Sequence, residues 1–111
     1  MRPLSKNQIN LRFFRLLLVA DVEVKQLEFR GIKREHLGVY FEELGAKRVT
    51  DRFPFVYAAN DWTGEIVSEQ EITFTSSFKV NAVTVRFHAK DQIELAELIK
   101  NYRYKTTRIG G

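Results

Sequence analysis

The sequence predicts an α+β fold, a two-layer sandwich of the ferredoxin-like (split β-α-β) class with extra strands. One observation is that Val83, Val85 and Phe87 alternate with polar residues, which is the period of a half-buried strand. Another is a pair of helical patterns, each with one apolar face, formed by Leu37, Tyr40, Phe41 and Leu44 and by Leu95, Leu98, Ile99 and Tyr102. Each pattern follows a strand, so each helix is expected to pack on the face of a shared sheet.

Two strands are expected before the first helix. Apolar and polar residues alternate from Ile9, so a strand is predicted from Ile9 to Leu18, with a turn at Asp21. A second strand is predicted from Val22 to Phe29, and a change of parity after Val24 indicates a β-bulge. One long bent strand is the alternative to this pair.

The first helix is expected between two glycines that end elements. Gly31 ends the preceding strand, and Gly45 follows the last apolar position, where a helix takes a left-handed residue because glycine has no Cβ to clash. Gly38 lies inside the helix, at a cost of about 1 kcal/mol relative to alanine. Such a glycine can mark a close approach to a neighbouring strand.

Three strand segments are predicted between the two helices. The first runs from Lys47 to Thr50 and the second from Phe53 to Ala59, where Pro54 lacks a ladder donor and indicates an edge or a kink. The residues from Asn60 to Gly64 are typical of a turn. A strand from Glu65 to Thr75 follows, with Ile66, Ile72 and Phe74 on one side and Glu65, Glu69 and Glu71 on a solvated side.

The last unit is a strand, a helix and a closing strand. A turn at Thr75–Ser77 leads into the strand from Phe78 to His88. Asp91 with Glu94 forms a capping-box pattern at the start of the second helix. The basic residue Lys105 is expected to begin a short closing strand that ends at Gly111.

The two helical units superimpose with one constant shift along the chain, which places Phe29 on Phe87, Leu37 on Leu95 and Lys47 on Lys105. Two such units in tandem favour the ferredoxin-like arrangement, with both helices on one face of an antiparallel sheet. The alternative is a β-grasp-like arrangement, in which an opening hairpin from Ile9 to Phe29 packs on the first helix.

The composition places the chain among small globular proteins. Its 111 residues make one domain, and 44 % hydrophobic residues are enough for one core. The absence of cysteine excludes disulfides and thiolate sites. No segment resembles a membrane span or a signal peptide, so a cytoplasmic protein without membrane contact is expected. The net charge of +4 permits an anionic partner without requiring one.

The residues that carry most protein chemistry are sparse. Histidine is the usual acid–base group near neutral pH, and the chain has two. His36 is expected on the surface of the first helix, and His88 at the end of a strand. No nucleophile elbow, metal-ligand spacing or phosphate-binding glycine loop is present. We therefore expect no catalytic residues, no cofactor and no metal.

The basic residues offer one functional hypothesis. Lys100, Arg103, Lys105 and Arg108 run through the C-terminal region with Tyr102 and Tyr104 between them. Aromatic residues beside cations can stack bases and hold phosphates, so nucleic-acid (RNA) binding is an alternative function. The signature of an RNA-recognition strand is absent, and cations in the last helical turn also stabilise the helix dipole.

The C-terminal residues Arg108, Ile109, Gly110 and Gly111 are similar to the tails of ubiquitin-like modifiers and sulfur carriers. The resemblance implies a terminal carboxylate that is activated after a slim, flexible tail enters a partner enzyme. It also implies a β-grasp core, for which an opening hairpin followed by a helix is suitable. A second strong helix directly before the tail departs from that pattern.

We expect a non-catalytic binding or accessory domain that acts on a protein partner, or on a second copy in a homodimer, through its sheet face or edge. The strand from Phe53 to Ala59 is the expected pairing edge. Trp62 lies at a turn, where it can anchor an interface or fold back onto the core. The candidate binding residues are Trp62, Arg103, Tyr104, Lys105, Arg108, Gly110 and Gly111.

Overall fold

The computed structural model of the chain describes residues 22–110, which form a five-stranded sheet and two helices. Neighbouring strands are all antiparallel, in the order β1-β5-β4-β3-β2. This confirms a mixed α+β domain. The elements are β1 (Glu23–Arg30), α2 (Arg34–Glu43), β2 (Lys47–Arg48), β3 (Phe55–Ala58), β4 (Trp62–Thr75), β5 (Phe78–Ala89) and α3 (Gln92–Gly110).

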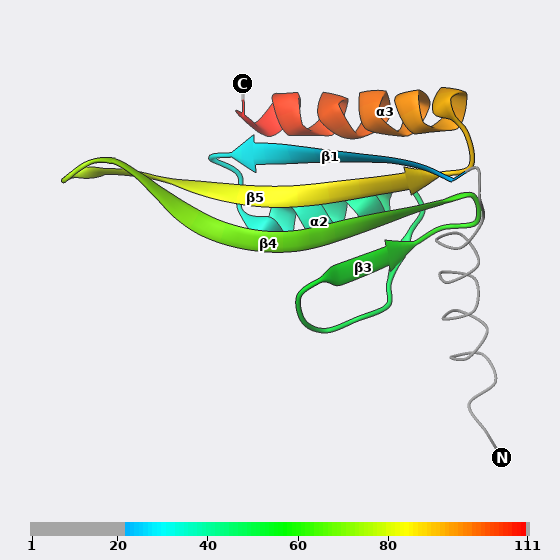
Figure 1. The fold of residues 1–111 in the computed structure, drawn as a ribbon, viewed down its shortest axis with the longest axis horizontal. Coiled ribbons are helices and arrows are strands. Elements are labelled where there is room, and N and C mark those ends of the chain that lie inside the picture. Colours follow the sequence, from blue (N-terminus) through cyan, green and yellow to red (C-terminus); the bar gives the residue numbers. More distant parts are fainter. Residues whose placement is uncertain (1–21, 111) are drawn as a thin grey trace, which may run out of the picture.

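Both helices pack on one face of the sheet and enclose an aromatic core (Figure 1). The Phe87 ring on β5 lies 5.7 Å from Phe41 of α2 and 5.1 Å from Tyr102 of α3, measured between ring centroids. The hydroxyl of Tyr102 donates a hydrogen bond to the Leu37 carbonyl at 2.6 Å, which joins the two helices. The predicted apolar faces of both helices are therefore confirmed.

Several local predictions are also confirmed. The Asp91 carboxylate accepts a 2.8 Å hydrogen bond from the Glu94 amide, as an N-cap residue does. Gly45 follows α2 with a φ of 111°, the left-handed backbone that favours glycine. A Cβ on Gly38 would overlap the Tyr57 hydroxyl, so this glycine does mark a close approach of α2 to a strand.

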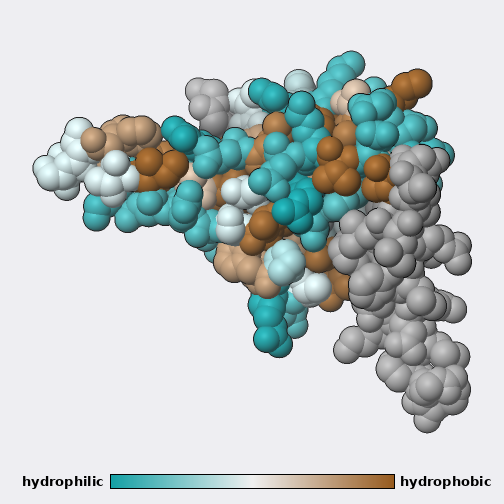
Figure 2. Space-filling view, in the orientation of Figure 1, coloured by the Kyte–Doolittle hydropathy of each residue, from teal (hydrophilic) through white to brown (hydrophobic). Residues whose placement is uncertain are grey.

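The strands β4 and β5 form a long hairpin whose turn end projects beyond the rest of the sheet (Figure 1). The rings of Phe74 and Phe78 near that end lie 5.5 Å apart, and both are more than half exposed. Hydrophobic residues on this projecting end appear in brown in Figure 2. The chain turns between Thr75 and Phe78, as the sequence predicts.

The sequence predicts that Glu65, Glu69 and Glu71 share one face of the strand, but a register shift in β4 separates Glu65 from the other two. Pairing with β5 shifts between Ile66 and Ser68, which indicates a bulge at this point. Glu65 lies before the shift, on the face away from the helices, and is buried. Glu69 lies after it and pairs with Val83 on the helix side, where it contacts Arg34 of α2 at 3.6 Å. The prediction of one shared solvated face is therefore wrong.

The predicted closing strand after Lys105 is also wrong, because α3 continues to Gly110. Thr106 is buried one turn beyond Tyr102 and extends the apolar stripe of the helix. The hydroxyls of Thr106 and Thr107 donate hydrogen bonds to the carbonyls of Arg103 and Tyr104, at 2.8 and 2.9 Å. Both hydroxyls therefore have hydrogen-bond partners within the helix. The second unit thus lacks the last strand that a ferredoxin-like repeat requires.

Two further predictions about strands are wrong. The predicted bulge in the strand after Val22 is absent, because β1 pairs with β5 without interruption from Glu23 to Arg30 and Val24 points to the other face. The stretch Phe53–Ala59 was predicted to lie at an edge or to start after a kink at Pro54; the strand does start after Pro54, at Phe55, but its predicted place at the edge is wrong. Strand β2 pairs with β3 on the side away from β4, so β3 is not an edge strand.

The predicted strand from Ile9 to Leu18 and the turn at Asp21 lie outside the described residues. Neither described helix combines the length and the apolar character that crossing a membrane requires.

Candidate functional site

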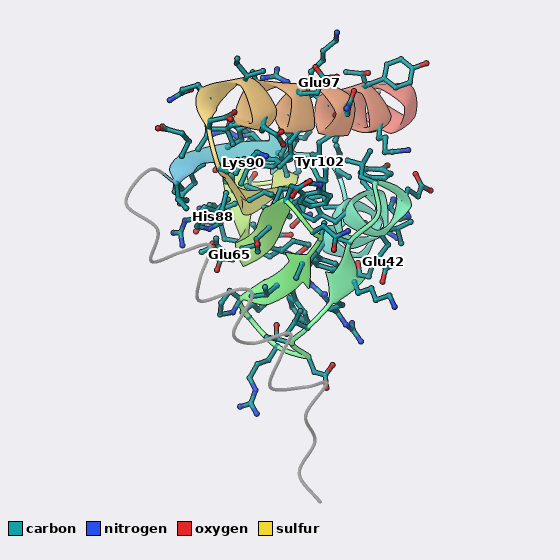
Figure 3. All side chains as sticks on the ribbon, turned by 90° about the vertical axis from the view of Figure 1, so that its right-hand side faces the viewer. Glu42, Glu65, His88, Lys90, Glu97 and Tyr102 are labelled. Atoms are coloured by element: carbon teal, nitrogen blue, oxygen red, sulfur yellow. The ribbon has the colours of Figure 1, made fainter. Side chains whose placement is uncertain are left out.

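A buried histidine and a buried glutamate face each other on the sheet surface away from the helices. Strand β5 places His88 on this face and β4 places Glu65 there, two residues along from Thr63, which lies directly opposite His88. The Nε2 atom of His88 lies 2.7 Å from the Glu65 carboxylate, and the two side chains are 4 % and 8 % exposed. Figure 3 shows the two labelled side chains close together.

Arg86 extends this pair toward β1. Its guanidinium lies 3.4 Å from the Glu65 carboxylate and donates to the Gln26 side chain at 3.0 and 3.2 Å. Burial alone raises the pKa of the Glu65 carboxyl, but the hydrogen bond and charge of His88 and the charge of Arg86 outweigh burial and lower that pKa. Glu65 is therefore held as the anion.

The chemistry open to this pair is limited. A carboxylate that orients an imidazole is a common part of general-base and metal sites. The Nδ1 atom of His88 is buried without a hydrogen-bond partner. Among the hydrogen bonds described, however, none brings a hydroxyl or an amine nucleophile to this ring, and no cluster of three metal-ligating side chains occurs within residues 22–110. Within residues 22–110, the pair fixes the orientation of an imidazole, and no further catalytic group joins it.

The structure agrees with the predicted position of His36 more closely than with that of His88. His36 is exposed on α2, as expected. His88 lies at the end of β5, as expected, but it is buried rather than on the surface, and its pairing with Glu65 was missed. The hairpin turn after Thr75 was correctly predicted, and regular pairing counted back from Thr75 and Phe78 sets Glu65 opposite His88. The register shifts move Glu65 two residues from that position and keep both residues on one face.

The candidate binding residues separate into two places. Arg103 and Tyr104 are exposed on α3, and Tyr104 is 68 % exposed. Lys105 donates to the Glu43 carboxylate of α2 at 2.9 Å. Arg108 and Gly110 belong to the last turns of the same helix, whereas Gly111 lies outside the described residues.

Trp62 lies apart from that group, at the start of β4. Its ring lies 5.8 Å from Phe41 and packs against the core, so it folds back rather than standing free at a turn. The indole also borders a depression beside the first turns of α3, with Ile93 and Glu97. The remaining candidates lie toward the other end of that helix.

The aromatic residues of α3 differ in how available they are for stacking. Tyr102 is fully buried, and burial raises the pKa of its hydroxyl well above the usual value. It therefore presents no ring to a nucleic-acid base, and of the two interleaved tyrosines Tyr104 is the exposed one. The basic surface of α3 thus has less stacking area than the sequence predicts.

One family comparison gives a match. The model of a family described as archaeal MoaD-like protein matches residues 25–111, which include all of α2, α3 and the five-stranded sheet apart from the first two residues of β1. No curated protein and no solved structure matches the chain. Because the family match spans well over half of the sequence, the chain belongs to the family of archaeal MoaD-like proteins.

Proposed function

We propose that this chain is a carrier protein of the ubiquitin-like or sulfur-carrier kind, which acts through its C-terminal Gly110–Gly111. The observation that carries the proposal is the extent of the family match, which runs to the last residue and so includes both glycines. MoaD-like membership also favours a relationship to the β-grasp class, the alternative that the sequence offered for the fold. The chain itself performs no catalysis and needs no cofactor in this proposal.

The chemistry of such a tail follows from its size. Glycine has no side chain, so a Gly-Gly end can carry its carboxylate through a narrow channel into the active site of a partner. A carboxylate oxygen is a poor leaving group and must first be activated. Attack of the carboxylate on the α-phosphorus of ATP, with loss of pyrophosphate, gives an acyl adenylate. A sulfur or amine nucleophile then displaces AMP from the acyl carbon.

The tail must leave α3 to act in this way. The helix includes Gly110, and glycine is among the least favourable helix residues, by about 1 kcal/mol relative to alanine. Helix ends also fray readily, because their last carbonyls lack intrahelical partners. Release of the last turn therefore costs little, while the buried Tyr102 and Thr106 keep the rest of α3 packed on the sheet.

The proposal includes a protein partner, because the activating chemistry has to come from outside the chain. It also retains a cytoplasmic location, where ATP is available. A homodimer is not required. Nucleic-acid binding has less support than the sequence suggests, since Tyr102 is buried and Lys105 is paired with Glu43.

Mass spectrometry of the protein from its native cells tests the proposal. Trypsin cleaves after Arg108, so a lysine modified by this chain keeps an Ile-Gly-Gly remnant. A sulfur carrier instead shows the intact mass of the full chain with one carboxylate oxygen replaced by sulfur. A matched chain without Gly111 should give neither product. The proposal fails if the full chain also gives neither product in cells with sulfur and ATP in supply.

A further inference from the structure

A groove of about 370 Å³ runs between the outer strand β1 and helix α3. Its floor is apolar and its rim is basic. The floor includes Leu27, Leu95 and Ile99, and the rim includes Lys25, Lys100 and Arg103. Strand β1 is the last strand on this side of the described sheet, so the groove opens along a sheet edge.

The backbone of β1 offers hydrogen bonds along that edge. The amide of Gly31 donates to the Asn81 carbonyl of β5 at 2.8 Å, so the odd-numbered residues of the strand make the bonds to β5. In an antiparallel ladder the intervening residues point their N–H and C=O groups the other way. The groups of Val24, Gln26 and Glu28 therefore face outward, where no described strand pairs with them.

The charges on the rim lack partners within the described part of the chain. Seven described cations have a carboxylate within 4 Å, as Lys90 has Glu94 and Lys105 has Glu43. No such ion pair is found for Lys25, Lys100 or Arg103. Three cations around one apolar groove favour an occupant that carries carboxylates as well as apolar side chains.

We propose that this groove binds an acidic, extended segment of a partner protein, which adds to β1 as a sixth strand. Backbone hydrogen bonds along β1 supply affinity, and alternate side chains of the segment enter the groove and supply specificity. Apolar side chains rest on Leu27 and Ile99, and flanking carboxylates meet the basic rim. This binding surface goes beyond the carrier proposal and does not use Gly111.

A second copy of the chain is a poorer occupant than an acidic segment. Pairing of β1 with β1 across a two-fold axis brings Lys25, Lys100 and Arg103 of one copy toward the same cations of the other. Like charges that face each other in an interface are unfavourable. The charge of the groove thus selects a different chain of opposite sign.

A short fluorescent peptide tests the proposal with the full-length protein. In the nine-residue probe Thr-Glu-Thr-Ile-Thr-Ile-Thr-Glu-Thr, Glu, Ile, Ile and Glu share one face of a strand. Fluorescence anisotropy should show saturable binding that weakens as salt is added. Amide chemical shifts should change along β1 and the exposed side of α3. A probe with Lys in place of Glu should not bind, and a probe N-methylated at its central residues should bind more weakly, because it cannot complete the ladder.

Charge reversal gives the matched control. The double variant Lys100→Glu and Arg103→Glu should weaken binding of the acidic probe by about tenfold or more, since two favourable pairs become repulsive. Lys47→Glu reverses an exposed cation on β2, at the opposite edge, and should leave the affinity unchanged. Deletion of Gly111 should also leave it unchanged, which separates this surface from the carrier function.

Three outcomes would overturn the proposal. One is equal binding of the acidic and basic probes, and another is a set of shift changes away from β1 and α3. The third is a concentration-dependent dimer whose interface includes β1, which would assign the edge to a second copy.

Discussion

The imidazole of His88 and the carboxylate of Glu65 lie 2.7 Å apart on adjacent strands, and both side chains are more than nine-tenths buried. A buried charged group is costly unless it is paired. In this pair the carboxylate gains a hydrogen bond from the ring and a second contact from Arg86 at 3.4 Å. Loss of either partner therefore leaves the other buried without its main contact.

Replacement of Glu65 by glutamine should make stability less dependent on pH. The pKa of Glu65 is lowered in the fold, so its contribution is present above the ordinary value of 4.5 and is lost as the pH falls through the lower folded value. At neutral pH, Glu65→Gln should reduce the free energy of unfolding by about 1–3 kcal/mol. Under acid conditions the difference from the unmodified protein should shrink. Urea denaturation across the acid range measures both.

Glu71→Gln is the matched control for that prediction. Glu71 lies on the same strand but is exposed, with Lys79 3.9 Å away. Its replacement should change stability by no more than about 0.5 kcal/mol at any pH. If Glu65→Gln destabilised the protein equally at acid and neutral pH, the lowered pKa of Glu65 would be the wrong explanation.

Replacement of Tyr102 by phenylalanine should loosen the contact between the helices. The change removes the hydroxyl that donates to Leu37 at 2.6 Å and leaves that buried carbonyl with one bond fewer. The expected loss is about 1–2 kcal/mol in the free energy of unfolding. Tyr104→Phe alters an exposed tyrosine on the same helix and should have little effect.

The raised pKa of Tyr102 predicts that Tyr102→Phe also changes how stability depends on pH under alkaline conditions. Burial raises that pKa well above 10.0, so the contribution of Tyr102 is present below its unfolded pKa and is lost as the pH rises toward the folded value. The unmodified protein should therefore lose stability above about pH 10, and Tyr102→Phe should lose less over the same range. An equal loss in both proteins would assign the alkaline transition to another group.

The sequence predicted the elements better than their arrangement. Hydrophobic periodicity identified the strand that contains Val83 and both helix faces, because each pattern depends on residues a few positions apart. The order of the strands depends on which of them meet across the sheet, and no local pattern in the chain records that. The predicted closing strand after Lys105 failed for a local reason: β-branched Thr106 and Thr107 favour strands in general but satisfy their hydroxyls inside α3.

The candidate site was predictable only in part. The glycines at the C-terminus are visible directly in the sequence, and the family match includes them. The pair of Glu65 and His88 was not, because alternation places both residues on the face away from the core but does not show that this face is buried around them. Strict alternation assigned Glu65 to solvent, and the shift places the buried and the exposed carboxylates of that strand on different faces.

Gly38 should not tolerate a methyl group. In a helix interior, alanine is preferred over glycine by about 1 kcal/mol, so Gly38→Ala would be stabilising on an exposed face. Here the added Cβ would overlap the hydroxyl of Tyr57, a buried ring that stacks on Phe41 at 5.4 Å. We expect a net loss of about 1–3 kcal/mol in the free energy of unfolding.

A second substitution separates crowding from other causes. The atom in the way is the Tyr57 hydroxyl, so Tyr57→Phe should make room for the new methyl group. Gly38→Ala should then cost much less in the Tyr57→Phe background than in the unmodified protein, a coupling that a double-mutant cycle measures directly. Additive effects would show that the loss comes from somewhere other than this contact.

Trp62 should contribute to stability as a core residue. Its ring packs against Phe41, and the loss of a partly buried indole should cost about 2 kcal/mol or more in the free energy of unfolding of Trp62→Ala. Circular dichroism is the suitable measurement, because the chain has one tryptophan and the variant loses its fluorescence. Ile93→Ala, which truncates a side chain that is 82 % exposed beside the same depression, should change stability by less than about 0.5 kcal/mol. If Trp62→Ala were as stable as the unmodified protein, the indole would have to act outside the core, as an anchor for a partner.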